Sequence, residues 1–185
     1  ISEKVIVFSD LKPKNIQLTV KANAADVKGT LALSANDGWT ITIKNPEFNL
    51  TGKGDEVVLE AVVTPTKAVT SGELFAFLRI AENKYNKSIQ RIEYDHIPYQ
   101  FILSEAKAKL VNMDLKKTGT NIAYIPGAGD DVAACLKQIG YNVTILCGEL
   151  LTKEDLSKYN AIVSGIRAYN TNDRLQVHYS KLMDC

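Results

Sequence analysis

The sequence lacks most of the features by which a function is usually recognised. It has no apolar run near the roughly 18 residues of a membrane span and no signal segment after Ile1, and the missing initiator Met suggests a processed chain or an excised fragment. Its net charge of +1 leaves no basic footprint for nucleic acid or for an anionic membrane. The three cysteines, Cys135, Cys147 and Cys185, are an odd number without short spacing. They therefore predict neither a disulfide framework nor a zinc knuckle.

Histidine is also scarce, with only His96 and His178 in the chain. His96 follows Asp95, so this pair could be half of a metal site or of an acid–base site. The alternative is a hydrogen-bonded histidine that fixes the exit of a strand before Pro98. A metal site needs about three or four ligands, and no others cluster nearby in the sequence. We therefore expect no metal site and no catalytic residue in this chain.

What the first hundred residues do contain is strict alternation of apolar and polar side chains. A period of two buries one face of each strand in a core and leaves the other in water. Turn residues separate the runs at Asn36–Gly38, Thr51–Asp55 and Ser71–Gly72. About seven short strands at this spacing are typical of an antiparallel sandwich. The apolar positions that share a face are Ile16, Leu18, Val20 and Ala22; Trp39, Ile41 and Ile43; Val57, Leu59, Ala61 and Val63; and Leu74, Ala76, Leu78 and Ile80.

We expect Ile89–Tyr94 to pair with Leu74–Ala81 across the polar loop between them. Trp39 is in phase with Ile41 and is predicted to lie in the core. Tyr85 is predicted at a hairpin tip, either as a solvated aromatic or as a partner contact.

The composition changes near Ser104, where we place the boundary between an all-β domain at 1–104 and a second domain at 105–185. The second part alternates strands with helices: strands are predicted at Ile122–Ile125, Val143–Cys147 and Ala161–Ile166. Asp130 is predicted to cap the first helix, which would bury Cys135, and Gly140 to end it. This pattern of three strand–helix units predicts a parallel, flavodoxin-like α/β sheet.

Open parallel sheets bind ligands beyond the carboxyl ends of their strands. If this domain binds a ligand, its candidate binding residues are therefore those that follow the strands. Arg167 is the best candidate for contact with an anion, and a salt bridge to Asp130, Asp131 or Glu149 is the competing explanation. The full candidate set is Gly127, Gly129, Asp130, Asp131, Glu149, Arg167, Tyr169 and Asn170.

Two more specific functions of these loops, dinucleotide binding and nucleophilic catalysis, have little support in the sequence. Gly127-Ala128-Gly129 with Glu149 matches part of a dinucleotide-binding fingerprint, but Val132 replaces the third glycine and two aspartates stand where phosphate would bind. A nucleophilic Cys147 needs a glycine-flanked elbow and an activating base, yet Leu146 precedes it and no motif histidine follows. The alternative is that Cys147 is a small core residue at the end of a strand.

Three runs carry a family resemblance: Ile92-Glu93-Tyr94-Asp95-His96-Ile97-Pro98, then Asn121–Asp131, then Leu156–Thr171 with its Gly-Ile-Arg-Ala-Tyr-Asn segment. Together they closely resemble the C-terminal extension of large bacterial PIG-L (LmbE-like) deacetylases, which are common in Bacteroidetes. The upstream part, expected to be an immunoglobulin- or fibronectin-like sandwich, is similar to the alpha-galactosidase-associated or fibronectin-like modules found in that family, and the second part is similar to the opening half of an amidotransferase-like, flavodoxin-like domain.

The resemblance implies a non-catalytic accessory fragment of a zinc-dependent deacetylase that acts on N-acetylglucosamine-type sugars. It places the zinc and the His-Pro-Asp-Asp motif in a missing N-terminal catalytic domain, so no cofactor is expected in this chain. The implied partners are that catalytic domain and glycan, and the implied location is the cell envelope or the exterior. The alternative function is a small-ligand-binding or amidotransferase-like α/β domain with a pocket at the carboxyl ends of its strands.

Overall fold

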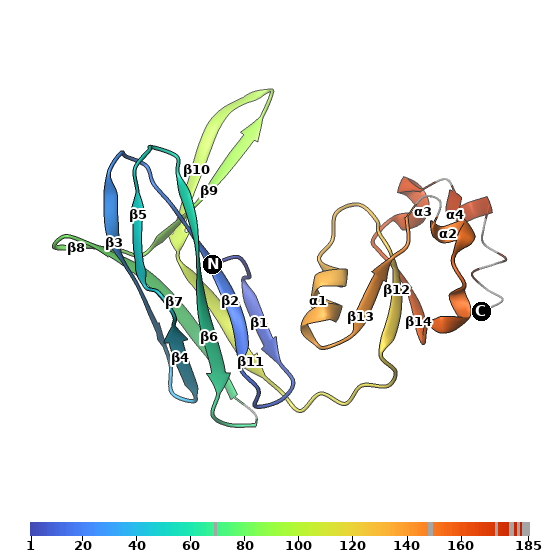
Figure 1. The fold of residues 1–185 in the computed structure, drawn as a ribbon. Helices are drawn as coiled ribbons and strands as arrows, with labels where there is room; N and C mark the ends of the chain where they lie inside the picture. The colour runs from blue at the N-terminus through green and yellow to red at the C-terminus, as the bar shows by residue number, and fades with distance from the viewer. Residues whose placement is uncertain (69, 148–149, 173, 178–179, 181, 183–185) are drawn as a thin grey trace. The chain divides into compact units, whose positions relative to one another are not determined.

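The chain divides into two compact units, Ile1–Asp114 and Leu115–Cys185 (Figure 1). The structure is a computed structural model that describes residues 1–68, 70–147, 150–172, 174–177, 180 and 182. Strands make up most of its regular structure, and the first unit is a β-sandwich. No helix in these ranges is long and apolar enough to cross a membrane.

Two sheets form the sandwich around one core. The larger sheet has the order β1-β11-β7-β3-β5, with β8 attached to β7, and the smaller sheet has the order β2-β6-β4. Strand β1 pairs in parallel with β11, whereas the other pairs are antiparallel. The strands of the larger sheet are β1 (Val5–Phe8), β3 (Val27–Ala35), β5 (Glu47–Leu50), β7 (Thr70–Ile80), β8 (Asn83–Tyr85) and β11 (Lys107–Asn112), and those of the smaller sheet are β2 (Lys14–Lys21), β4 (Trp39–Ile43) and β6 (Glu56–Pro65).

The core of the sandwich follows the predicted alternation. In β2, Ile16, Leu18 and Val20 are buried while the residues between them are exposed. Trp39 is also in the core, as predicted, and its ring centroid lies 5.1 Å from that of Phe8. The faces predicted for β2, β4, β6 and β7 are the buried or half-buried ones, whereas β3 buries only Leu31 and β8 buries no residue, so alternation does not mark every strand.

The predicted boundary near Ser104 falls too early, because the next segment is a strand of the sandwich. Strand β11 pairs with β7 and β1, and it buries Ala108, Leu110 and Asn112. The unit therefore extends to Asp114. The predicted turn at Ser71–Gly72 was wrong for a related reason, since these residues lie within β7 opposite β11.

The predicted pairing of Ile89–Tyr94 with Leu74–Ala81 was also wrong. Strand β9 (Lys87–Tyr94) pairs with β10 (Ile97–Glu105) in a separate two-stranded sheet. His96 lies in the exposed turn between these two strands, at the tip of a hairpin and not at the exit of a sheet.

The second unit holds a three-stranded parallel sheet in the order β13-β12-β14. Its elements are β12 (Asn121–Ile125), α1 (Val132–Gln138), β13 (Asn142–Ile145), α2 (Leu150–Lys153), a 3-10 turn η1 (Leu156–Lys158), β14 (Ala161–Ser164), α3 (Ala168–Thr171) and α4 (Arg174–Val177). A small separate core forms here from Ala123, Ile125, Leu146, Leu156, Ala168 and Leu175. The predicted strands are present, but β14 is only partly buried, so it is not covered on both faces as expected.

The helices of this unit differ more from the prediction. Helix α1 contains no buried residue, so Cys135 is exposed and not in the core. Cys147 is likewise exposed, and the neighbouring Leu146 fills the core position instead. Cys185 and His178 lie outside the described residues.

Candidate functional site

The carboxyl ends of β12 and β14 are held together by the side chain of Asp130. Its Oδ1 accepts hydrogen bonds from the Tyr124 hydroxyl and, at 3.2 Å, from the amide of Val132. Its Oδ2 accepts the amide of Ile166 at 2.9 Å. The amide of Ala128 donates to the carbonyl of Ile166 at 2.8 Å, so the loop after β12 is joined to the loop after β14 by backbone as well.

Two glycines allow this close approach. A Cβ on Gly165 would lie 2.7 Å from Oδ2 of Asp130 and would collide with the Tyr124 hydroxyl. A Cβ on Gly127 would collide with the carbonyl oxygen of Ile166. The loops after β12 and β14 therefore lie in direct contact at the carboxyl ends of their strands.

The protonation states of Tyr124 and Asp130 are determined by burial and by the hydrogen bonds around them. Burial, and then the hydrogen bond to the Asp130 carboxylate, raise the pKa of Tyr124 to about 12. The hydrogen bond from Tyr124, and then those from the amides of Ile166 and Val132, lower the pKa of Asp130 below its ordinary value. At neutral pH the pair is accordingly a neutral phenol that donates to an ionised carboxylate.

The other predicted site residues are only partly gathered here. Gly127 lies against Ile166, and Gly129 is in an exposed loop with φ +71°. Asp131 is the residue before α1, but its side chain makes no capping hydrogen bond. Arg167 is exposed, has a left-handed backbone with φ 57° and precedes α3, which carries the exposed Tyr169 and Asn170. Glu149 lies outside the described residues.

The expected salt bridge of Arg167 to Asp130 or Asp131 is not formed in the part of the chain that the structure describes. The carboxylate of Asp130 instead binds Tyr124, Val132 and Ile166. The sequence alone could have indicated Tyr124, because an aromatic hydroxyl inside an otherwise apolar strand needs a hydrogen-bond partner when it is buried.

The chemistry available at this edge is limited. A phosphate would need the amides at the start of α1, and Asp130 already binds the Val132 amide. Among the described residues, no three His, Cys, Asp or Glu side chains are grouped so that they could hold a metal ion. These residues therefore do not fit the zinc that the family resemblance implies for a catalytic domain.

A second candidate site lies on the outer face of the larger sheet. A hollow of about 180 Å³ is open to solvent here, and the aromatic rings at its floor come from β7. Across the sheet, Ser34 of β3 and Lys107 of β11 lie opposite Phe75. The residues that line the hollow are Ser34, Phe75, Ala76, Phe77, Lys84, Asn86, Glu105 and Ala106.

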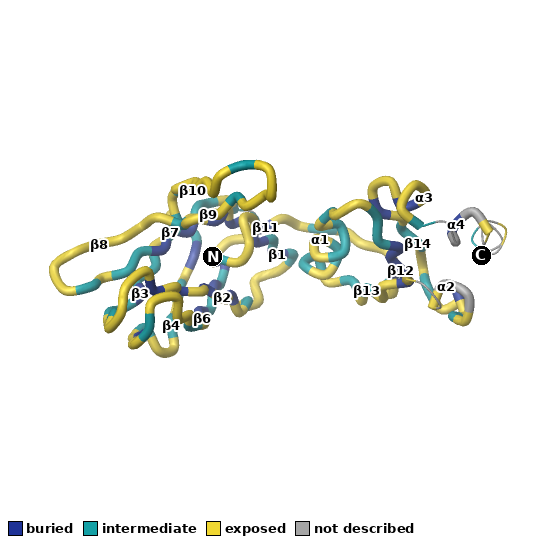
Figure 2. Tube along the Cα trace, turned by 90° about the horizontal axis from the view of Figure 1, so that it is seen from above, coloured by how far each residue is buried: buried dark blue, intermediate teal, exposed yellow. Residues whose placement is uncertain are grey.

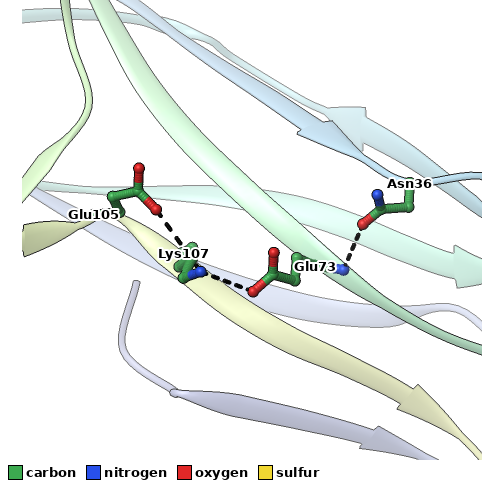
Figure 3. Close-up of polar contacts among 4 residues, drawn as sticks. All are labelled: Asn36, Glu73, Glu105 and Lys107. Atoms are coloured by element: carbon green, nitrogen blue, oxygen red, sulfur yellow. Dashed lines mark hydrogen bonds and ion pairs between the residues drawn. The ribbon is translucent and has the colours of Figure 1, made fainter.

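A chain of polar contacts crosses the same part of the sheet, through Asn36, Glu73, Lys107 and Glu105 (Figure 3). The Nζ of Lys107 lies 2.9 Å from Glu73 and 3.7 Å from Glu105, and the amide of Glu73 donates to Asn36 at 2.8 Å. The hydrogen bond to Glu73 is the main cause that raises the pKa of Lys107. The Nζ of Lys84 lies 3.7 Å from the centroid of the Phe77 ring.

Sequence reasoning missed the hollow, although β7 contained a signal for it. Leu74, Ala76 and Leu78 were assigned to the core, and Phe75 and Phe77 between them fall on the opposite face. A strand that is apolar on both faces, with large aromatic residues on its outer one, indicates a covered or binding surface.

Comparisons with known proteins identify no family. No protein-family model matches the chain, and no curated protein matches it. Among solved structures the chain is similar to Escherichia coli alpha-2-macroglobulin, with 14% identity over 58% of this chain and a TM-score of 0.39. It is also similar to Salmonella alpha-2-macroglobulin reacted with methylamine, with 14% identity over 61% of this chain and a TM-score of 0.36.

A third similar structure is SSP-19, an MSP-domain protein like family member of Caenorhabditis elegans, with 8% identity over 60% of this chain and 94% of that one, and a TM-score of 0.33. The chain spans only 6% of the length of the two macroglobulins. At these identities and TM-scores the matches identify neither a family nor a function.

Proposed function

We propose that this chain is a non-catalytic accessory region of a PIG-L (LmbE-like) deacetylase, and that its β-sandwich contacts glycan through the hollow on β7. The observation that carries the proposal is the pair of half-buried aromatic rings, Phe75 and Phe77, on an outer sheet face rimmed by polar side chains.

The hollow has the chemistry that a sugar ring needs. One face of a pyranose is mostly C–H and suits an aromatic ring, while its hydroxyls and amide need hydrogen-bond partners. Phe75 supplies the apolar surface, and Ser34, Asn86 and Glu105 supply donors and acceptors. Each ring has a lysine over it, since Nζ of Lys84 lies 3.7 Å from the centroid of Phe77 and Nζ of Lys107 lies 5.9 Å from that of Phe75, so Phe75 is the less closely covered ring. The volume of 180 Å³ suits a single sugar unit and not a long chain.

The non-catalytic part of the proposal is supported by the loops of the second unit. In flavodoxin-like sheets the ligand lies between the first and third strands, at the point where the strand order reverses. The order β13-β12-β14 has this 2-1-3 arrangement, which favours the flavodoxin-like, amidotransferase-like assignment of the unit. Asp130 closes that point by bonding Ile166.

The alternative function is a small-ligand site at these same strand ends, with Arg167 as the anion contact. Its exposed position and its backbone in the left-handed region favour this alternative, since strained residues are frequent in binding loops. Arg167→Ala in the full-length protein distinguishes the accessory function from the small-ligand site. Unchanged activity and unchanged ligand binding would remove the alternative.

Sugar binding is tested by isothermal titration of the chain with N-acetylglucosamine oligomers. We expect weak binding, which Phe75→Ala reduces by about tenfold or more because the stacking surface is lost. Tyr85→Ala is the matched control, since Tyr85 is an exposed aromatic between two lining residues and does not line the hollow. Equal affinities for the two variants would contradict the proposed surface.

The proposal that the chain belongs to a deacetylase is tested separately. The reading frame upstream should encode a His-Pro-Asp-Asp motif, and its absence would remove the deacetylase assignment. Deacetylase activity or bound zinc in residues 1–185 alone would contradict the accessory role.

A further inference from the structure

The hairpin β9–β10 exposes a large apolar surface that has no role in the sandwich. Its two strands pair with each other, and neither pairs with another strand within the described residues. Figure 1 shows the hairpin extending from the rest of its unit, and Figure 2 shows that both strands are largely exposed. A two-stranded hairpin is only marginally stable alone, so a ribbon of this kind benefits from a partner that covers it.

One face of the hairpin carries most of the apolar groups. The register places Leu103 opposite Ile89 and Phe101 opposite Arg91, on the same face. The exposed fractions are 49% for Ile89, 61% for Tyr99, 64% for Phe101 and 62% for Leu103. Isolated exposed apolar residues are ordinary, but a contiguous group of this size marks an interaction surface.

The charges on this face cancel. Nε of Arg91 lies 3.0 Å from Glu93, and its guanidinium lies 4.2 Å from the centroid of the Tyr99 ring. At the base of the hairpin, Lys87 lies opposite Glu105. The face therefore carries two positive and two negative groups, Arg91 among the apolar side chains and the Lys87–Glu105 pair at the base, and no charged residue occurs between Ile97 and Ser104. Two such faces can approach each other without net repulsion, which is the requirement for a self-complementary contact.

We propose that the hairpin is a homodimerisation surface, on which a second copy of this chain packs the same face about a two-fold axis. The apolar side chains Ile89, Tyr99, Phe101 and Leu103 of one copy would cover those of the other. Arg91, opposite Phe101 and next to Tyr99, would lie within the contact, where Glu93 of its own copy already neutralises its charge. This inference is independent of the proposed glycan site.

The available area predicts a weak dimer. At about 100 Å² of exposed surface for each of its four large apolar side chains, the face offers about 400 Å² per copy, against about 800 Å² per partner in a stable complex. Such an interface corresponds to association at about 1 µM to 1 mM, as expected of a transient contact.

The test is sedimentation velocity of residues 1–185 over that concentration range. We expect the weight-average mass to rise from one copy towards two. Phe101→Ser combined with Leu103→Ser should weaken association by about tenfold or more, since both side chains lie at the centre of the face. Leu11→Ser is the matched control because Leu11 is 52% exposed outside the hairpin and should leave association unchanged.

A second variant is needed because Phe101→Ser with Leu103→Ser could weaken association by unfolding the hairpin. Arg91→Glu retains the apolar groups but leaves the face with one positive and three negative charges, so it should also weaken association, and more so at low salt. A chain that stays monomeric up to 1 mM would overturn the proposal. So would a dimer that neither hairpin variant weakens.

Discussion

At the scale of single residues, Asp130 decides how the loops after β12 and β14 meet. It is ionised, it accepts three hydrogen bonds, and its Oδ2 lies against Gly165, where there is no room for a side chain. A carboxylate in this position does what a bound anion does in a related fold, which is to satisfy the amides at the loop ends. Asp130, one of the predicted ligand contacts, thus joins these two loops.

Removing the Tyr124 hydroxyl tests this view of Asp130. Tyr124→Phe should lower the melting temperature of the second unit by roughly 4–8 °C, the effect of about one lost hydrogen bond in a unit this small. It should also raise the pKa of Asp130 towards its ordinary value, because the Tyr124 hydrogen bond is the largest cause that lowers it. Thermal denaturation and carboxylate NMR titration measure the two effects. Unchanged values for both would mean that the hydrogen bond is unimportant.

The same pair predicts how the stability of the second unit depends on pH. The pKa of Tyr124 in the folded chain is about 12, against about 10 for an unfolded tyrosine. Its contribution is therefore fully present below about pH 10 and is lost as the pH rises towards 12. For Asp130 the folded pKa is lowered, so its contribution is present above the unfolded value near 3.9 and is lost as the pH falls below it.

Urea denaturation at several pH values, followed by tyrosine absorbance, measures this dependence. Tyr124→Phe serves as the control, since it should remove the loss of stability that ionisation of Tyr124 causes above about pH 10. If the free energy of unfolding of the variant falls equally at alkaline pH, another group causes the loss of stability.

At the scale of the elements, β11 determines where the first unit ends. It lies between β1 and β7 and contributes the fully buried Leu110 to the core. A domain that ended before β11 would lack the strand with which β1 pairs, so β1 would no longer join the sheet. A correct boundary is therefore a matter of sheet pairing and cannot be read from the composition.

A pair of fragments tests the role of β11. Residues 1–114 should fold, whereas residues 1–104 should not, because the shorter fragment exposes the core at β7 and loses the pairing of β1. Tryptophan fluorescence of Trp39, the single tryptophan, reports the core in both. A shorter fragment with the same buried emission and cooperative unfolding would place the boundary back near Ser104.

The sequence predicted the elements whose burial follows one simple period and failed for the others. Alternation identified β2, β4, β6 and most of β7. Strand β11 was missed because Lys107 and Lys109 made an alternating strand look like a polar linker. Cys135 fits the apolar face of a helix, but α1 is short and buries nothing. The pairing of β9 with β10 and the hollow on β7 depend on which strands become neighbours, which local periodicity does not determine.

At the scale of the whole molecule, the two units have different properties. The first unit carries the exposed features: the hollow on β7 and the apolar hairpin. The second unit uses its polar groups to close the loops of a small parallel sheet. With a net charge of +1 the chain has no strong field to attract a charged partner, so recognition has to come from local shape and chemistry. The accessory role that we propose therefore rests on the surface features of the first unit.

The most direct test of that account is an NMR titration of the ¹⁵N-labelled chain with N-acetylglucosamine oligomers. The account predicts that amide shifts change at the residues lining the hollow, in β3, β7, β8 and the segment Glu105–Ala106, and that the loops around Asp130 and Arg167 do not respond. Shift changes at those loops, or no change in the sandwich at millimolar sugar, would contradict it.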